Sequence, residues 1–304
     1  MVVYSVVVPL YNEEAVIRES YKRLKAVLDG MGEPYELIFV NDGSGDKTME
    51  IARGLAENDK ALRVIGFSRN FGHQIAITAG MDAAAGQAVV VIDSDLQDPP
   101  EVIPEMAAKW KEGWQVVYGK RGRRKGETLF KKLTAKAFYR IINAMTDIDM
   151  PVDTGDFRLI DRKVLNAMKT LPERNRYVRG LVTWVGFRQT SVEYTRHERF
   201  AGETKYPLRK MIKFASDGMV SFSHAPLKIG VFIGTLMIAA GLCLGIAMLI
   251  WFERLFSFAG LVAALGLTGN GIVLLCVGIQ GQYLARMYDE AKGRPLYIIG
   301  EVIN

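Results

Sequence analysis

The sequence predicts an α/β fold: a parallel or mixed sheet covered by helices on both faces, then interfacial helices and a two-helix transmembrane hairpin. Three observations predict this architecture. Apolar runs of strand length alternate with helix-length runs from residue 1 to about residue 165. Polar clusters follow three of the predicted strands. Two long uncharged runs come after residue 228.

The alternating half of the chain divides into strands and helices of ordinary length. Short apolar runs bounded by polar or turn residues predict strands, and longer amphipathic runs predict helices. The strands are expected at Val2–Pro9, Tyr35–Asn41, Leu62–Ser68, Ala88–Ile92 and Gln115–Gly119. The helices are expected at Glu13–Leu28, Lys47–Asn58, Gln74–Ala84 and Glu101–Glu112.

Two carboxylates, Asp93 and Asp95, stand at the end of the apolar strand Ala88–Ile92. Acidic residues are poor strand formers, and ligands of open α/β sheets bind at the carboxyl ends of the strands. Carboxylate oxygens suit Mg²⁺ or Mn²⁺, and Mg²⁺ typically binds one or two carboxylates plus substrate phosphates. The alternative is an acidic turn that caps the helix beginning at Pro99-Pro100.

Two further strand ends carry polar residues, Pro9 to Glu14 and Asn41 to Ser44. Taken singly, Asn12 could cap a helix beginning at Glu13, and the Asp42-Gly43 pair could form a turn. Three such clusters on one sheet edge favour a nucleotide-phosphate site. The segment ending in Lys47-Thr48 lacks the spacing of a P-loop, and no GxGxxG follows the first strand.

Residues Ile229–Phe252 and about Phe256–Ile279 contain no charged side chain, and each run is long enough to span a bilayer as a helix. The alternative is a buried helical hairpin in a soluble protein. Basic residues flank the two runs on their outer sides, so the positive-inside rule places both termini in the cytoplasm. The preceding residues, 205–228, mix apolar and basic side chains, as expected of an interfacial helix; an ordinary surface helix is the alternative.

The net charge of +6 favours an anionic partner. No nucleic-acid-binding module is recognisable. Basic residues gather at Lys120–Lys125 and Lys131-Lys132, either as a solvated face or beside the membrane. The cysteines, Cys243 and Cys276, lie in the apolar runs and support neither a disulfide framework nor a zinc site. The N-terminal residues do not have the pattern of a signal peptide. The histidines, scattered along the chain, form no expected ligand set: His73, His197 and His224.

Five motifs in order resemble one known family. They are Val7-Val8-Pro9-Leu10-Tyr11-Asn12-Glu13-Glu14, Val40-Asn41-Asp42-Gly43-Ser44, Ser68-Arg69-Asn70-Phe71-Gly72, Asp93-Ser94-Asp95-Leu96-Gln97-Asp98-Pro99-Pro100-Glu101 and Asp153-Thr154-Gly155-Asp156-Phe157-Arg158. Together they resemble family 2 glycosyltransferases of the GT-A fold, which has a Rossmann-like mixed sheet. More narrowly, the chain is similar to the polyisoprenyl-phosphate glycosyltransferases, the group of bactoprenol glucosyltransferase and dolichyl-phosphate mannose synthase. The sequence departs from the mannose synthase pattern around Asp156.

This resemblance implies roles for individual residues. Pro9, Tyr11, Glu13 and Asp42 match positions that hold the nucleotide base and ribose. Asp93, Asp95 and Gln97 match the set that binds Mg²⁺ or Mn²⁺ and the diphosphate.

The remaining matched positions are basic or acidic. Arg121 matches a phosphate contact, and Arg199 and Lys205 match a mobile basic loop that closes over the donor. Asp156 matches an acidic position usually nominated as the catalytic base, and Asp153 is a second candidate. Asp156 and Asp95 are thus the expected catalytic residues.

The implied reaction is inverting transfer of a monosaccharide from a nucleotide sugar to a polyisoprenyl phosphate. UDP-glucose is the first expectation for the donor, ahead of UDP-N-acetylglucosamine and UDP-galactose, and undecaprenyl phosphate is expected as the acceptor. The alternatives are a processive polysaccharide synthase, whose QxxRW element and larger channel this chain lacks, and a catalytically silent scaffold that binds nucleotide sugar. A phosphate monoester has a second pKa near ~6, so the attacking oxygen scarcely needs a base. Asp156 is therefore expected to orient substrate, or to ligate through a cation, rather than to remove a proton.

The expected organisation is a cytoplasmic catalytic domain at 1–204, an interfacial segment at 205–228, a transmembrane hairpin at 229–284 and a cytoplasmic tail at 285–304. The location implied is the bacterial inner membrane. The tail Gly293–Ile299 could form an edge strand that pairs with a neighbour, which predicts a homo-oligomer.

Overall fold

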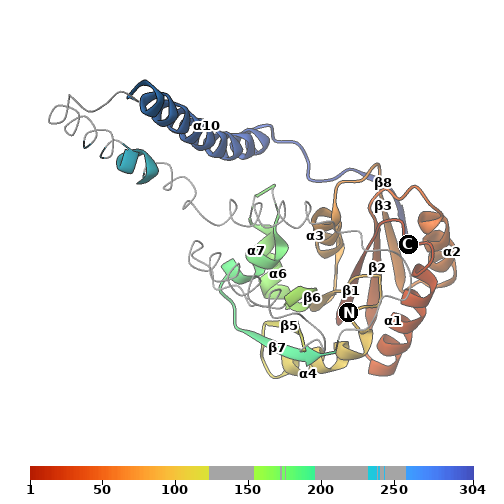
Figure 1. Ribbon diagram of the computed structural model, residues 1–304. Helices are drawn as coiled ribbons and strands as arrows, with labels where there is room; N and C mark the ends of the chain where they lie inside the picture. Colours follow the sequence, from red (N-terminus) through yellow and green to blue (C-terminus); the bar gives the residue numbers. More distant parts are fainter. Residues whose placement is uncertain are drawn as a thin grey trace.

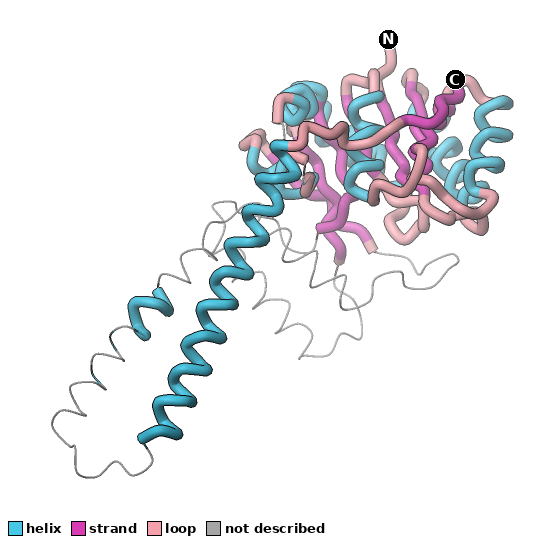
Figure 2. The backbone as a smooth tube through the Cα atoms, turned by 90° about the horizontal axis from the view of Figure 1, so that it is seen from above, coloured by secondary structure: helices cyan, strands magenta, loops and turns pink. Residues whose placement is uncertain are grey.

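The computed structural model describes residues 1–122, 154–171, 173–174, 176–195, 232–237, 239, 243 and 258–304. Within these ranges the chain forms an eight-stranded mixed sheet with the strand order β7-β5-β6-β4-β1-β2-β3-β8. Helices cover both faces of the sheet, and a long helix, α10, extends away from it (Figures 1 and 2). The sheet therefore forms the middle layer of a three-layer domain.

The strands and helices of the sheet domain alternate along its first half. The strands are β1 (Tyr4–Leu10), β2 (Tyr35–Asn41), β3 (Leu62–Phe67), β4 (Ala88–Val91), β5 (Val116–Arg121), β6 (Thr154–Asp161), β7 (Gln189–Tyr194) and β8 (Ile299–Ile303). The helices are α1 (Ile17–Met31), α2 (Thr48–Asn58), α3 (His73–Ala83), the short 3₁₀ helix η1 (Pro100–Val102), α4 (Ile103–Lys111), α6 (Arg162–Lys169), α7 (Val178–Trp184) and α10 (Phe258–Ala291).

The central strands are parallel, and the outer ones make the sheet mixed. β1 pairs in parallel with β2 and β4, and β2 pairs in parallel with β3. β6 runs antiparallel to β4 and β5, while β7 runs parallel to β5. The parallel strands β1, β2, β3 and β4 consequently bring their carboxyl ends to one edge, the edge expected to bind ligands.

Each sheet face buries its own hydrophobic core. Alternate residues of β1 point to opposite faces, so Val6 and Val8 pack with α1, α2 and α4, while Val7 packs with α3, α6 and α7. Every residue of β1 is buried, as expected of a strand covered on both sides. A Cβ added to Gly80 would lie 2.2 Å from Val7 Cγ1, so α3 packs directly on β1.

The predicted elements of the first half are confirmed, with shifted boundaries. β2 has the expected bounds. The largest shift is at α1, which begins at Ile17 rather than Glu13. Before it, the backbone N–H groups of Asn12 and Glu13 donate to Ser44 Oγ (3.0 Å) and Thr48 Oγ1 (2.8 Å). These residues form a loop that is hydrogen-bonded to the segment following β2. The alternative that Asn12 caps a helix beginning at Glu13 is therefore wrong.

The C-terminal residues form an edge strand, as expected, but at Ile299–Ile303 instead of Gly293–Ile299. The strand pairs antiparallel with β3 of the same chain, and Tyr297 stacks on Phe67 with ring centroids 5.2 Å apart. Arg53 forms an ion pair with Glu301 across this edge. The end of the chain is thus part of the sheet domain rather than a separate tail, and pairing with a second copy stays a prediction.

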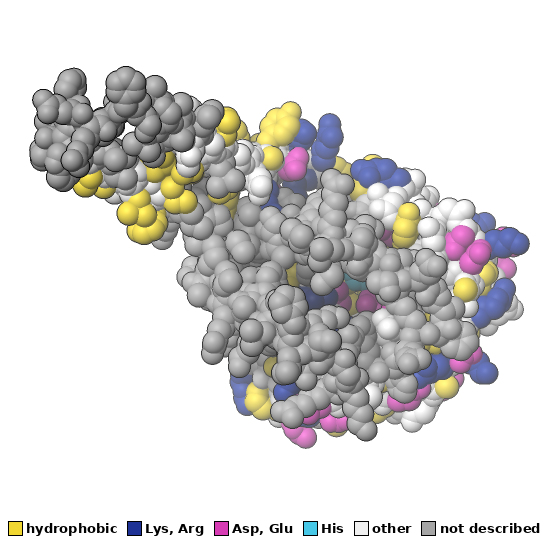
Figure 3. Space-filling model, in the orientation of Figure 1, with side chains coloured by type: hydrophobic (Ala, Val, Ile, Leu, Met, Phe, Trp, Pro, Cys, Tyr) yellow, Lys and Arg dark blue, Asp and Glu magenta, His cyan; other side chains and the backbone are white. Residues whose placement is uncertain are grey.

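The predicted membrane segments lie partly outside the described residues. These include the interfacial segment 205–228 and most of the first span. α10 covers most of the second span, and in the portions that the structure describes no helix is long and apolar enough to cross a membrane. Apolar side chains are exposed along α10, among them Val273, Leu274 and Val277 (Figure 3). The transmembrane hairpin remains a prediction.

Candidate active site at the sheet edge

The acidic turn after β4 is held by a backbone-to-side-chain hydrogen bond and contains one residue with an unusual backbone conformation. The Gln97 N–H donates to Asp95 Oδ1 at 3.1 Å, and Leu96 between them has a φ of 58°. A positive φ at a bulky residue is strained, and such strain concentrates at functional sites. Neither η1 nor α4 has a side-chain cap, so the alternative that these acids cap the following helix is wrong.

Asp98 anchors the far end of this turn below the surface. It is 1% exposed, accepts a hydrogen bond from the Tyr194 hydroxyl of β7, and lies 3.8 Å from Arg121 Nη2 of β5. A Cβ at Gly155 would lie 2.6 Å from Arg121 Nη2, so the absence of a side chain there admits the guanidinium. Arg121, expected to contact phosphate, therefore stands between the acidic turn and β6.

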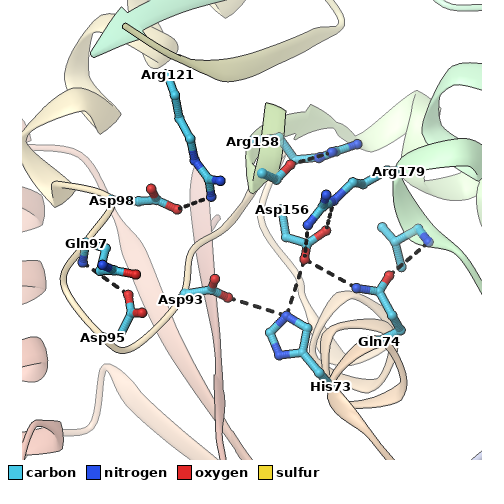
Figure 4. A network of polar contacts seen from close by, with 12 residues as sticks. His73, Gln74, Asp93, Asp95, Gln97, Asp98, Arg121, Asp156, Arg158 and Arg179 are labelled. Carbon is cyan, nitrogen blue, oxygen red and sulfur yellow. Dashed lines mark hydrogen bonds and ion pairs between the residues drawn. The ribbon is translucent and has the colours of Figure 1, made fainter. Parts of the chain in front are cut away.

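Asp156 of β6 is enclosed by donors from two helices (Figure 4). Arg179 of α7 donates from Nε to Oδ1 at 2.8 Å and from Nη2 to Oδ2 at 3.0 Å. Gln74 Nε2 and His73 Nε2 of α3 each lie 3.3 Å from Oδ2. Burial alone would raise the pKa of Asp156, but Arg179 and His73 outweigh it and hold the pKa well below its usual range. The carboxylate is therefore ionised near neutral pH.

His73 also reaches the acidic turn, since its Nε2 lies 3.4 Å from Asp93 Oδ1 (Figure 4). Burial lowers the pKa of His73, but Asp93 and Asp156 raise it to about 9. Burial is the main cause that raises the pKa of Asp93 to about 6; His73 opposes this, and the nearby Asp156, Asp98 and Asp95 add to it. Acidic, basic and histidine side chains are visible together on this face (Figure 3).

Arg158, two residues beyond Asp156 on the same strand, is 4% exposed and donates to the Gly155 carbonyl at 2.9 Å. Burial lowers its pKa to about 10. Positively charged arginine side chains therefore lie among the carboxylates of the site.

Asp42, at the end of β2, holds the loop that leads into α3. Its carboxylate, 2% exposed, accepts hydrogen bonds from the backbone N–H groups of Phe71 (2.6 Å) and Gly72 (2.9 Å) and from Asn70 Nδ2 (2.9 Å). Burial raises the pKa of Asp42, against the backbone hydrogen bonds from Phe71 and Gly72, which lower it. The predicted contact with the nucleotide stays a prediction; the structure gives Asp42 the task of placing the first residues of α3.

The other predicted nucleotide contacts lie at the ends of β1 and β2. Pro9 is buried within β1, whereas Tyr11 is 43% exposed just beyond it. The Gly45 N–H donates to Asn12 Oδ1 at 2.9 Å, and the Glu13 N–H bond to Thr48 joins the same two loops. These loops therefore form one surface with Tyr11 at its rim. Arg199, Lys205, Asp153 and the predicted basic residues between 123 and 132 lie outside the described residues.

The residues at the turn fit a hard divalent cation. Among the residues that the structure describes, no three His, Cys, Asp or Glu side chains are arranged to hold a metal ion. Mg²⁺ needs only one or two carboxylates when substrate phosphates complete its coordination. Asp93 Oδ1 is buried without a hydrogen bond, and the raised pKa of Asp93 reflects burial and nearby negative charge that a cation would offset. Asp93, Asp95 and Gln97 would supply oxygen ligands of the preferred kind.

The mixed α/β sheet with acids following a central strand is of the GT-A type, a fold of nucleotide-sugar glycosyltransferases. A crystal structure of glucosyl-3-phosphoglycerate synthase from Mycobacterium tuberculosis, with Mn²⁺, UDP and phosphoglyceric acid, shares this fold; the TM-score is 0.51 at 23% identity, covering 72% of this chain and 76% of that one. The chain belongs to glycosyl transferase family 2, whose family model matches residues 5–168. It is therefore a glycosyltransferase.

Relatives of this family match nearly the whole chain. An uncharacterized glycosyltransferase of Bacillus subtilis (strain 168), YkcC, is 58% identical over 97% of this chain and 93% of the relative. The bactoprenol glucosyl transferase of Shigella phage SfII is 38% identical over 97% of this chain and 96% of its own length. The resemblance drawn from the five motifs is confirmed.

Sequence reasoning missed three members of the network around Asp156. His73 directly follows the Ser68–Gly72 motif at the same sheet edge, and that proximity is the sequence signal that marks it. Gln74 comes next to it on α3. Arg179 lies on the short helix α7, and no motif marks it. Only the packing of α3 and α7 over β6 brings these side chains to Asp156.

Proposed function

We propose that this glycosyltransferase transfers glucose from UDP-glucose to undecaprenyl phosphate, giving a lipid-linked sugar for modification of a cell-envelope glycan. The observation that carries the proposal is the acidic turn of Asp93 and Asp95 facing Asp156 across the sheet edge, joined by His73. The name of the Shigella phage relative supports the donor sugar and the acceptor class. The Mn²⁺ and UDP in the name of the M. tuberculosis complex support the cation and the nucleotide.

In the proposed reaction an oxygen of the lipid phosphate attacks the anomeric carbon while the bond from that carbon to the UDP oxygen breaks, with inversion. Negative charge then builds on the leaving diphosphate. A Mg²⁺ or Mn²⁺ ion held by Asp93, Asp95 and Gln97 would supply a Lewis acid for that charge. Arg121 adds a fixed guanidinium beside the turn, and the predicted closing loop with Arg199 and Lys205 would add two more positive charges.

Asp156 serves this reaction by charge and position rather than by taking a proton. Both of its oxygens accept from Arg179, and Oδ2 has Gln74 and His73 beside it. Its side chain is 6% exposed. A carboxylate with a depressed pKa is a weak base, and the attacking phosphate is already largely ionised near neutral pH.

The acceptor places the enzyme at a membrane, which we propose is the bacterial inner membrane with the catalytic domain and both termini cytoplasmic. The exposed apolar side chains of α10 and the uncharged run Ile229–Phe252 support this location. A homo-oligomer formed through the β8 edge is the remaining proposal for a protein partner.

A transfer assay separates this function from its alternatives. The full-length protein in lipid vesicles is given undecaprenyl phosphate, Mg²⁺ or Mn²⁺, and radiolabelled UDP-glucose, UDP-N-acetylglucosamine or UDP-galactose in turn. The proposal expects labelled lipid with UDP-glucose. Labelled polymer would indicate a polysaccharide synthase, and nucleotide binding without transfer would indicate a silent scaffold. An Asp95→Asn variant is the control, since it keeps the size of the side chain and removes the charge.

A further inference from the structure

His73 occupies a position between two carboxylates that belong to different strands. Its Nε2 lies 3.4 Å from Asp93 Oδ1, after β4, and 3.3 Å from Asp156 Oδ2, in β6 (Figure 4). The proposed reaction does not itself require this imidazole. Its side chain is 35% exposed and that of Asp93 is 29% exposed, whereas that of Asp156 is only 6% exposed. The imidazole therefore joins a carboxylate that faces the site to one that is enclosed.

The enclosed end of this contact is firmly held. Arg179 binds both oxygens of Asp156, a two-point contact that fixes the carboxylate plane. Gln74 donates to Asp156 and accepts from the Val178 N–H at 3.0 Å, so it ties α3 to the start of α7. Asp156 can therefore serve as a fixed point for the imidazole.

The backbone around His73 is held as well. Asp42 accepts hydrogen bonds from the N–H groups of Phe71 and Gly72, the two residues before His73. The Gly72 carbonyl in turn accepts from the N–H groups of Ile75 and Ala76 in the first turn of α3. The imidazole thus projects from a backbone whose place is set by the end of β2.

We propose that His73 is a positioning residue for Asp93, anchored through Asp156 to Arg179. By lying between the two carboxylates, it keeps Asp93 aimed along the acidic turn and shields it from the charge of Asp156. The inference rests on the proposed function, because that function gives Asp93 its task of holding the cation and the diphosphate. Groups that orient a ligating side chain in this way affect metal affinity by about 10–100-fold.

Cation binding measured without sugar transfer tests the inference. The full-length protein in detergent is titrated with Mn²⁺ in the presence of UDP, and free Mn²⁺ is followed by electron paramagnetic resonance. His73→Leu is expected to weaken Mn²⁺ binding about 10–100-fold. His73→Gln retains a side-chain N–H donor and should recover part of the loss. Both variants should bind UDP without Mn²⁺ as the wild type does.

Two arginine variants complete the design. Arg179→Lys keeps the positive charge but loses the two-point contact with Asp156, so it should weaken Mn²⁺ binding in the same direction as His73→Leu. Arg176→Lys is the matched control, because within the described part of the chain the hydrogen bonds of Arg176 go to the Leu171 and Glu173 carbonyls rather than to Asp156. Its Mn²⁺ affinity should equal that of the wild type.

The outcomes separate the inference from the function. Unchanged Mn²⁺ affinity in a folded His73→Leu protein overturns the inference, and sugar transfer by the wild type would leave the function standing. A His73-dependent Mn²⁺ affinity in a wild-type protein that transfers no sugar supports the inference and overturns the function. If His73→Leu fails to fold, the His73→Gln and Arg179→Lys proteins decide the question. Full wild-type Mn²⁺ affinity in both of these variants contradicts the positioning role.

Discussion

Replacing Asp156 with Asn is expected to destabilise the fold as well as to slow the reaction. Asn has nearly the same size as Asp, so the change removes charge without leaving a cavity. The Arg179 guanidinium, with its side chain 26% exposed, would then be partly buried without its carboxylate and would face an amide. Breaking a buried ion pair from one side costs about 3–5 kcal/mol, and the partial exposure of Arg179 favours the lower end, about 3 kcal/mol.

This loss is large enough to measure by thermal unfolding. For a chain of 304 residues, about 3 kcal/mol corresponds to a fall of roughly 5 °C in the midpoint. Near-ultraviolet circular dichroism of the full-length protein would follow the tertiary structure, with Arg176→Lys as the control. A double-mutant cycle with Arg179→Met should give a coupling of about 1 kcal/mol or more, because removing both charges leaves neither one unpaired. Additive effects, or an Asp156→Asn midpoint equal to that of the wild type, would refute the reasoning.

The pH dependence follows from the direction of the Asp156 shift. A carboxyl whose folded pKa is depressed stabilises the fold fully above its unfolded pKa, about 3.9, and this contribution is lost as pH falls through the folded value. The stability gap between wild type and Asp156→Asn should therefore be complete near neutral pH and narrow in acid. In a pH–rate profile, activity of Asp156→Asn restored at high pH would instead support a role as base.

Three further predictions concern other parts of the site. Gly43→Ala should lower both transfer rate and unfolding midpoint, because Gly43 has a φ of +62° and its added Cβ would lie 2.4 Å from the Arg69 backbone; Gly45→Ala, with nothing within 4 Å, is the matched control. Tyr194→Phe removes the hydroxyl that donates to buried Asp98 and should cost about 1–3 kcal/mol in denaturant unfolding, whereas an unchanged midpoint would show that the bond contributes little. Removing divalent cations with a chelator should abolish transfer and added Mn²⁺ should restore it, and transfer that persists in the chelator would contradict a cation-dependent site.

The sequence was sufficient to predict the strands that carry the acids. The run Ala88–Ile92 has no polar residue and ends at Asp93, so its burial and its functional end could both be predicted. β2 was also predicted with its observed bounds, since the apolar run Leu37–Val40 leads into the polar cluster that begins at Asn41. The start of α1 was misplaced because Asn12 and the acids after it satisfy helix-start rules locally, while their hydrogen bonds go to a loop distant in sequence.

Contacts between distant elements account for what the sequence could not predict. Arg179 meets Asp156 only because α7 packs over β6, and His73 joins Asp93 to Asp156 only because α3 begins beside both. No local sequence pattern predicts such contacts between distant elements. β8 is a short strand whose antiparallel partner, β3, lies near the opposite end of the chain.

The most direct test of the account is the fate of the sugar label when the full-length protein is incubated with UDP-glucose, undecaprenyl phosphate and Mn²⁺. Label should pass into the organic-solvent extract as glucosyl phosphoryl undecaprenol, and Asp95→Asn should reduce that transfer strongly. Label that remains entirely in the aqueous nucleotide sugar with wild-type protein, with the cation and the lipid phosphate present, would contradict the assignment of this sheet edge as a glucosyl-transfer site.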